Sequence, residues 1–143
     1  MQTGYTFLIT FILAWVVDHA IKITIRLIKK EKLGFWSQIF NSGGMPSSHS
    51  ATTVSLATII GLCYGFDSAI FAIGALFALV VMYDAVKVRR SSGEQGVAIR
   101  QLIKEQDSKV KMPRVALGHT PLEVFVGAIL GVAIGYVVFL SAF

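Results

Sequence analysis

The chain has 143 residues, of which 55% are hydrophobic and 15% are charged, and its formal net charge is +5 at pH 7. A soluble domain of this length does not need so many apolar residues, so the composition favours an integral membrane protein over a soluble one. The single cysteine, Cys63, excludes an internal disulfide and a metal motif built on paired cysteines. We expect one domain covering residues 1–143.

Four apolar segments are predicted to be transmembrane helices. In chain order they cover residues 5–28, 46–64, 68–88 and 121–143. Each has about 19–24 residues, which at a rise of 1.5 Å per residue suits a hydrocarbon core of about 30 Å. They are too long for buried strands and show no period-two alternation. The fold class is therefore predicted to be all-α, an integral membrane four-helix bundle.

The connections between these helices differ in character. Residues 28–44 are basic and aromatic, which is typical of a membrane interface. The second and third helices are joined by a tight turn around Asp67, and the third and fourth by about thirty residues, 89–120. Within this long connection, apolar residues between 97 and 103 alternate with polar ones. This pattern predicts a short interfacial amphipathic helix between the third and fourth helices, lying on the membrane surface.

The basic residues are distributed asymmetrically. All thirteen Lys and Arg lie between Lys22 and Arg114. With four spans, these residues fall on or near one membrane face. The opposite face, which holds both termini and the turn at Asp67, has none. The positive-inside rule then predicts a multi-pass protein of the cytoplasmic (inner) membrane, with the basic face in the cytoplasm and both termini outside.

Ionisable residues at membrane depth are costly in lipid and are functional candidates by default. Those of this chain, with the arginines beside them, fall at helix ends that share the basic face: Asp18, His19, Lys22, His49, Asp84, Arg89, Arg90, His119 and Glu123. If these residues had separate roles, they would not be expected to share one membrane face, so we expect them to form one site.

Two of the predicted helix starts have residues suited to binding an anion. In NSGGMPSSHSATT, residues 41–53, Gly43 and Gly44 allow the backbone to approach a ligand closely, and Pro46 is expected in the first helical turn. The candidate caps are Ser47, Ser48 and Ser50. LGHTPLEV, residues 117–124, has a similar pattern. Because helix N-termini offer free N–H donors and a partial positive charge, and lysine and arginine lie nearby, we expect a phosphate group as ligand.

Two histidines beside a phosphate suggest a division of labour. A neutral histidine can attack phosphorus to give a phosphohistidine, and a second, protonated histidine can donate a proton to the leaving oxygen. Glu123 lies four residues after His119 and is placed to hold that ring. An alternative for Glu123 is a capping box with Thr120, since the two have the Thr-x-x-Glu spacing.

These residues resemble the type 2 phosphatidic acid phosphatase superfamily, which includes the vanadium haloperoxidases. PSSH at residues 46–49 resembles its Pro-Ser-Gly-His motif, with Ser in place of Gly. His119 and Glu123 resemble the end of its Ser-Arg-x5-His-x3-Asp motif, with Glu in place of Asp and with no Arg at the motif's spacing. Lys22 with Lys29 has the spacing of its Lys-x6-Arg-Pro motif, with Lys in place of Arg and without the Pro. The blocks GGMPSSHSA, VVMYDAVKVRR and LGHTPLEV are similar to those of a divergent branch of small membrane proteins within that superfamily.

The resemblance implies that His119 is the nucleophile, Glu123 its orienting residue and His49 the general acid. It implies phosphate-binding roles for Lys22, Ser47, Ser48, Arg89 and Arg90. Supporting roles are expected for Asp18, Asp84, Gly43 and Gly44. Asp84 has no counterpart in the motifs, and we expect it either to pair with Lys22 or Arg89 or to hold a divalent cation. No other cofactor is expected.

The resulting prediction is a membrane phosphatase that acts on a lipid phosphate or diphosphate. One alternative is a catalytically silent lipid-phosphate-binding or scaffold protein. Another is a small ion- or proton-coupled transporter, which the clustering at one face disfavours because a relay should cross the bilayer. The expected partners are the lipid phosphate substrate and membrane lipids, without nucleic acid.

A glycine stripe marks the last apolar segment. Gly127, Gly131 and Gly135 form GxxxGxxxG, a pattern of close helix packing in membranes. It is expected either to pack the last helix within the bundle or to form a homodimer.

Overall fold

The computed structural model describes residues 4–30 and 44–142, and every regular element in this part of the chain is helical. In chain order the elements are α1 (Gly4–Ile28), α3 (Ser48–Tyr64), α4 (Ala69–Tyr83), the π-helical segment η1 (Asp84–Val88), α5 (Arg89–Glu105) and α6 (Pro121–Ala142). The predicted all-α class is confirmed.

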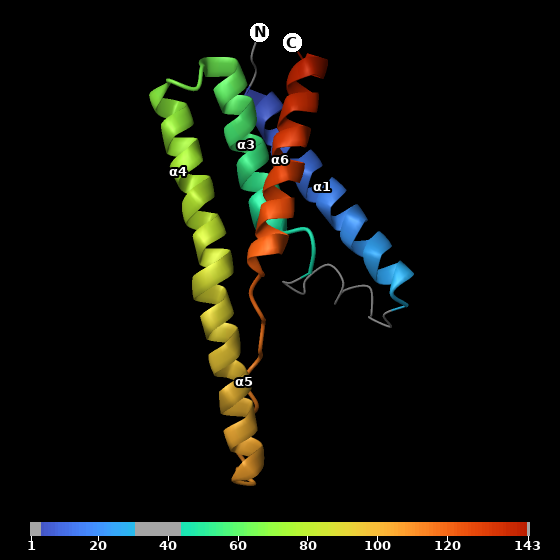
Figure 1. Cartoon of the computed structure of the whole chain (residues 1–143), viewed down its shortest axis with the longest axis vertical. Helices are drawn as coiled ribbons and strands as arrows, with labels where there is room; N and C mark the ends of the chain where they lie inside the picture. Colours follow the sequence, from blue (N-terminus) through green and yellow to red (C-terminus); the bar gives the residue numbers. More distant parts are fainter. Residues whose placement is uncertain (1–3, 31–43, 143) are drawn as a thin grey trace.

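Helix α3 occupies the centre of the bundle. It packs against α1, α4 and α6, and α1 also contacts α6. The beginning of α1, the end of α6 and the turn between α3 and α4 lie at one end of the bundle (Figure 1). The first residues of α3 and α6 therefore meet at the other end, which is where the predicted site residues lie.

Among the described residues, three helices are long and apolar enough to cross a membrane: Gly4–Ile28, Ala69–Glu105 and Pro121–Ala142. Helix α3 has 17 residues and buries Ser50, Thr52 and Ser55. Because α3 packs against the other three helices, these small polar side chains are buried in protein, and the hydroxyls of Thr52 and Ser55 donate to backbone carbonyls of α3 itself. Together these four helices form the predicted bundle.

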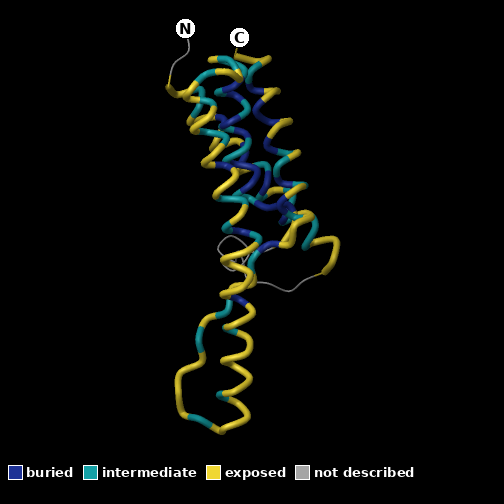
Figure 2. Tube along the Cα trace, turned by 60° about the vertical axis from the view of Figure 1, so that its left-hand side comes forward, coloured by how far each residue is buried: buried dark blue, intermediate teal, exposed yellow. Residues whose placement is uncertain are grey.

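Helices α4, η1 and α5 form one continuous helical run of 37 residues from Ala69 to Glu105. The predicted amphipathic helix is present as α5, but it begins at Arg89 and continues α4 beyond the bundle (Figure 1). The buried residues are concentrated in the bundle, whereas this extension is mostly exposed (Figure 2). After α5 the chain returns towards α6, and Gly93 and Gly96 allow Ala116 and Val115 to lie directly against the helix.

The glycine stripe of α6 packs inside the bundle, which is the first of its two expected roles. A Cβ atom added at Gly127, Gly131 or Gly135 would lie 2.5, 2.7 or 2.8 Å from a backbone carbonyl oxygen of α3 or its cap. The absence of side chains at these three positions therefore brings the backbones of α3 and α6 into contact. The homodimer prediction no longer has this stripe as its basis.

Candidate functional site

The two predicted catalytic histidines lie in contact distance of each other. His49 is the second residue of α3, and His119 lies just before α6. Their ring centroids are 5.7 Å apart, with the ring planes at 67°. Both line a cavity of about 370 Å³ that Arg89 and Asp84 also line. The start of α3 and the start of α6 thus contribute one histidine each to a common cavity.

His119 is held by its backbone and by its ring. Its backbone N–H donates to the Ala85 carbonyl of η1 at 3.0 Å, and its Nδ1 lies 3.1 Å from Oε2 of Glu123. A carboxylate only accepts, so Nδ1 carries the proton in this contact and Nε2 carries the lone pair. The residue is only 2% exposed. His119 is therefore fixed in the tautomer that a nucleophile needs.

Glu123 serves as an orienting residue and as a capping residue at the same time. Its Oε2 also accepts the Thr120 N–H at 3.0 Å, and its own N–H donates to Thr120 Oγ1 at 3.3 Å. These two bonds complete a capping box. The two roles that the sequence posed as alternatives coexist, because one carboxylate oxygen has two lone pairs.

Burial lowers the pKa of the His119 ring below its usual range, although the hydrogen bond that the ring donates to Glu123 acts in the opposite direction. The ring lies in the protein interior, where an imidazolium loses its hydration. His119 is therefore neutral at neutral pH, as nucleophilic attack requires.

Lys22 reaches the site from α1. It is 6% exposed, and its Nζ donates to Ser48 Oγ at 2.5 Å. The same nitrogen lies 3.1 Å from Oδ2 of Asp18, one turn earlier and fully buried, in an ion pair that lacks the alignment of a hydrogen bond. Arg89 thus lines the cavity of the two histidines, and Lys22 contacts Ser48, the residue before His49.

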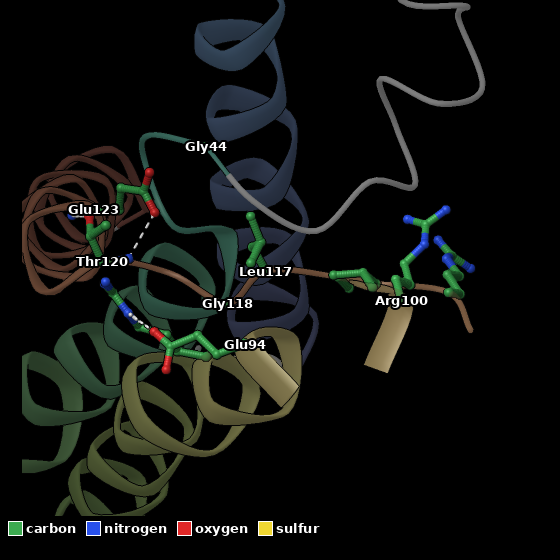
Figure 3. A pocket seen from close by; sticks show the side chains of 11 residues that line it. Gly44, Glu94, Arg100, Leu117, Gly118, Thr120 and Glu123 are labelled. Carbon is green, nitrogen blue, oxygen red and sulfur yellow. Dashed lines mark hydrogen bonds and ion pairs between the residues drawn. The ribbon is translucent and has the colours of Figure 1, made fainter. Parts of the chain in front are cut away.

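The structure separates Arg89 from Arg90. Arg89 Nε donates to Asp84 Oδ2 at 2.6 Å beside the histidines. Arg90 pairs with Glu94 at 3.2 Å and lines a neighbouring cavity of about 610 Å³. Figure 3 shows this second cavity, with Thr120 and Glu123 on one side, Gly118 and Leu117 along its middle, and Arg100 at the far side.

Of the roles expected for Asp84, the ion pair with Arg89 is observed. Within residues 4–30 and 44–142, no group of three or more His, Cys, Asp or Glu side chains is placed to hold a metal ion. A divalent cation at Asp84 stays a prediction.

The start of α3 differs from its predicted form. The N-cap is Ser47, Pro46 precedes it instead of entering the first turn, and the Ser47 side chain makes no capping hydrogen bond. A backbone hydrogen bond holds this start of α3 in place. The Ser47 N–H donates to the Glu123 carbonyl at 3.0 Å, so the N-cap of α3 lies against the first turn of α6. The hydroxyls of Ser47 and Ser50 are buried without a hydrogen-bond partner among the described residues.

The glycine-rich stretch before α3 is only partly described. Gly44 has φ +90°, a conformation that favours glycine, and it lines both the Arg90 cavity and a third cavity that contains Lys22. Gly43 lies outside the described residues.

Sequence reasoning missed the part played by η1. In this segment Arg89 N–H bonds to Asp84 O, five residues back, and the Ala85 carbonyl accepts from His119 instead. Gly118 makes that contact possible, since a Cβ there would lie 2.5 Å from Arg90 N and 2.8 Å from Ala85 O. The glycine before His119 was the one available signal, and nothing in the sequence of η1 itself indicates π geometry.

The fold is that of a multi-pass helical membrane protein with a polar site at one end of its bundle. A sequence model described as the divergent PAP2 family matches residues 4–134, and the chain belongs to this family. The chain is 37% identical over 140 residues to the uncharacterized membrane protein YuiD of Bacillus subtilis (strain 168), covering 87% of this chain and 88% of the relative. No solved structure matches the chain. The family resemblance inferred from the motifs is confirmed.

Proposed function

We propose that this protein is a membrane phosphatase that hydrolyses a lipid phosphate or diphosphate through a phosphohistidine intermediate. One observation carries the proposal: the ring of His119, held through Nδ1 by Glu123, lies 5.7 Å from the ring of His49 in a shared cavity. We also propose that residues 1–143 act as a single domain.

In the proposed first step, His119 Nε2 attacks phosphorus and the bond from phosphorus to the leaving oxygen breaks. His49 gives its proton to that oxygen. Glu123 stabilises the positive charge that the His119 ring acquires. In the second step, water attacks the phosphohistidine while His49 takes a proton from it. Inorganic phosphate leaves, and both histidines return to their starting states.

Three further groups are proposed to bind the phosphate oxygens. Arg89 supplies positive charge in the histidine cavity, Lys22 supplies a second positive charge, and Ser48, the residue before His49, supplies a hydroxyl that Lys22 contacts. Arginine and lysine are the usual donors to phosphate, and their charge-assisted hydrogen bonds are stronger than neutral ones. Arg90 is left out of this set because it does not line the histidine cavity and its side chain bonds to Glu94, whereas Lys22 bonds to the residue next to His49.

The surface of α1 supports a lipid as the substrate. An apolar groove of about 330 Å³ on α1 includes Ile21 and Ile25. Ile25 also lines the cavity that contains Lys22, Arg26 and Lys29. A phosphorylated lipid could therefore place its tail along α1 while its headgroup enters the polar end of the bundle.

The test is phosphate release by purified protein from phosphatidic acid, phosphatidylglycerol phosphate, and polyprenyl phosphates and diphosphates. We expect wild-type protein to release phosphate from at least one of them, His119→Ala to release none, and His19→Ala, in the third histidine, to retain activity. Activity should survive chelators if Asp84 only pairs with Arg89. Loss that only a divalent metal restores would move the chemistry to Asp84.

A second candidate is a lipid-phosphate-binding protein without turnover. It is favoured by the pairing of both proposed phosphate-binding cations with carboxylates, Lys22 with Asp18 and Arg89 with Asp84. Each carboxylate partly neutralises the positive charge of its partner, which leaves less positive charge to stabilise a phosphoryl transition state. Lipid binding without phosphate release from every substrate would favour this candidate.

A further inference from the structure

The contact between Asp84 and Arg89 suggests a role for a carboxylate that no motif assigns. We propose that Asp84 is the positioning residue for Arg89: it holds the guanidinium through Nε, so that the two terminal NH₂ groups are presented to phosphate. This inference rests on the proposed function, in which Arg89 is a phosphate ligand.

The π-helical segment creates this pair. Residues five apart do not face each other on an α-helix, where neighbours are three or four apart. In η1 the backbone bond runs from Arg89 N–H to Asp84 O, a spacing of five, and the side chains of the same two residues meet at 2.6 Å. Single π turns of this kind are frequent at functional sites. The same segment leaves the Ala85 carbonyl to accept the His119 N–H at 3.0 Å. One backbone irregularity therefore places a proposed ligand and the proposed nucleophile.

Arg89 uses one of its N–H donors for Asp84 and keeps the others for a ligand. A guanidinium has five N–H donors, of which Nε supplies one. Only Nε donates to Asp84, and the terminal groups of Arg89 donate to no side chain or carbonyl within the described parts of the chain. Arg89 also lines the cavity that both histidines share. Its free edge, with two parallel N–H groups, matches the bidentate geometry in which arginine binds phosphate.

Positioning and charge act on phosphate affinity with opposite signs, which allows the two effects to be separated. A carboxylate near a bound anion repels it, so removing the Asp84 charge alone should tighten phosphate binding. Removing the acceptor that fixes Arg89 should weaken binding, because the guanidinium must then be ordered when phosphate binds. Asp84→Asn keeps an oxygen that can accept from Nε but removes the charge. Asp84→Ala removes both.

The experiment measures the affinity of detergent-purified protein for inorganic phosphate by calorimetry. We expect Asp84→Asn to bind at least as tightly as wild type and Asp84→Ala to bind about fivefold more weakly than Asp84→Asn, the usual effect of one neutral hydrogen bond. In an Arg89→Ala background, Asp84→Ala should cause no further weakening. Because the Asp84 side chain is 38% exposed, these variants are expected to fold, and their helix content and melting temperature are checked by circular dichroism.

Glu94→Ala is the matched control, because Glu94 accepts from Nε of Arg90 in the same way on the same helical run and does not line the histidine cavity. Phosphate affinity should not fall in that variant. Equal tightening by Asp84→Asn and Asp84→Ala would overturn the positioning role and leave the phosphatase proposal standing. Unchanged phosphate affinity in Arg89→Ala would overturn the proposed ligand set and the inference with it, and wild-type protein that binds no phosphate would overturn both proposals.

Discussion

Oε2 of Glu123 lies 3.1 Å from Nδ1 of His119, and the same oxygen caps α6 by accepting the Thr120 N–H. The carboxylate that orients the proposed nucleophile, His119, is thus the one that caps the start of α6. The bond to the Thr120 N–H holds Oε2 of Glu123 in place. The His119 ring can therefore not rotate and keep its hydrogen bond to that oxygen. Capping and orientation are structurally coupled here, and substitutions can separate them.

The first prediction separates these two roles of Glu123. Glu123→Gln keeps an oxygen for the Thr120 N–H but loses the charge that stabilises a positive His119 ring, so kcat should fall by roughly tenfold or more while the melting temperature changes little. Thr120→Ala should do the reverse, lowering stability by about 0.5–2 kcal/mol through the lost cap with little effect on kcat. Activity assays and thermal melts of both variants provide the measurement. Loss of kcat in Thr120→Ala equal to that in Glu123→Gln would contradict the separation.

The second prediction concerns pH. Burial lowers the pKa of His119 from the ordinary value of 6.5, so the neutral, nucleophilic ring persists to more acidic pH than in a free histidine. Protonation of His119 removes the attacking lone pair, so kcat/KM should rise with pH through a midpoint below 6.5. At neutral pH His119 is already deprotonated, and its titration should no longer change kcat/KM. In Glu123→Gln the midpoint should move further down, because the carboxylate raises the pKa of His119. An acid limb centred above 6.5, or one that Glu123→Gln moves upwards, would exclude His119 as the titrating nucleophile.

The third prediction concerns the contact between α3 and α6. Gly131→Ala would place Cβ 2.7 Å from Ala51 O and 2.9 Å from Ser55 N, which are backbone atoms that cannot rotate away. The helices must then separate, and overpacking of this kind costs about 1–3 kcal/mol. Gly74→Ala is the control, since its nearest contact would be an ordinary 3.6 Å to the Ile60 side chain. Thermal unfolding in detergent should show a lower melting temperature for Gly131→Ala alone. Equal melting temperatures would refute the close packing.

Features that depend on nearby residues could be predicted from the sequence. The four apolar segments predicted the four helices, and the spacing of four residues predicted that Glu123 would reach His119. The contact between the histidines followed from topology, since alternate helix ends share a face. The sequence did not show that Arg89 and Arg90 would enter different cavities, although adjacent residues on a helix point about 100° apart. Nothing in residues 84–88 indicated η1, and the hydrogen bond from the His119 N–H to the Ala85 carbonyl joins residues far apart in the sequence.

The fourth prediction concerns orientation in the membrane. Thirteen basic residues lie between Lys22 and Arg114, and none lies in the segments that precede or follow them. The positive-inside rule therefore predicts a cytoplasmic site and external termini. A reporter that is active only in the cytoplasm, fused after Phe143, should be silent in intact cells, while the same reporter inserted after Ser108 should be active. Strong activity of the fusion after Phe143 would reverse the assignment and place the site outside the cell membrane.

The fifth prediction tests the two-histidine mechanism through the leaving group. His119→Ala removes the attacking nitrogen and should abolish turnover of every phosphate ester. His49→Ala removes the proton donor but leaves the nucleophile, and general acid catalysis is worth roughly 10²–10⁴-fold. A leaving group of low pKa, such as p-nitrophenolate, needs little protonation. Because the two rings lie side by side at 5.7 Å, each variant should remove one function from a cavity that is otherwise unchanged.

The measurement compares hydrolysis of p-nitrophenyl phosphate with that of a lipid phosphate by wild-type protein and both variants. His49→Ala should recover a larger share of wild-type activity on the aryl phosphate than on the lipid, whereas His119→Ala should recover on neither. A phosphorylated histidine should be trapped by rapid acid-free quenching of wild-type protein, and its amount should fall in His119→Ala. Recovery of His119→Ala on the aryl substrate, or undiminished lipid hydrolysis by both variants, would show that phosphorus is attacked by another group.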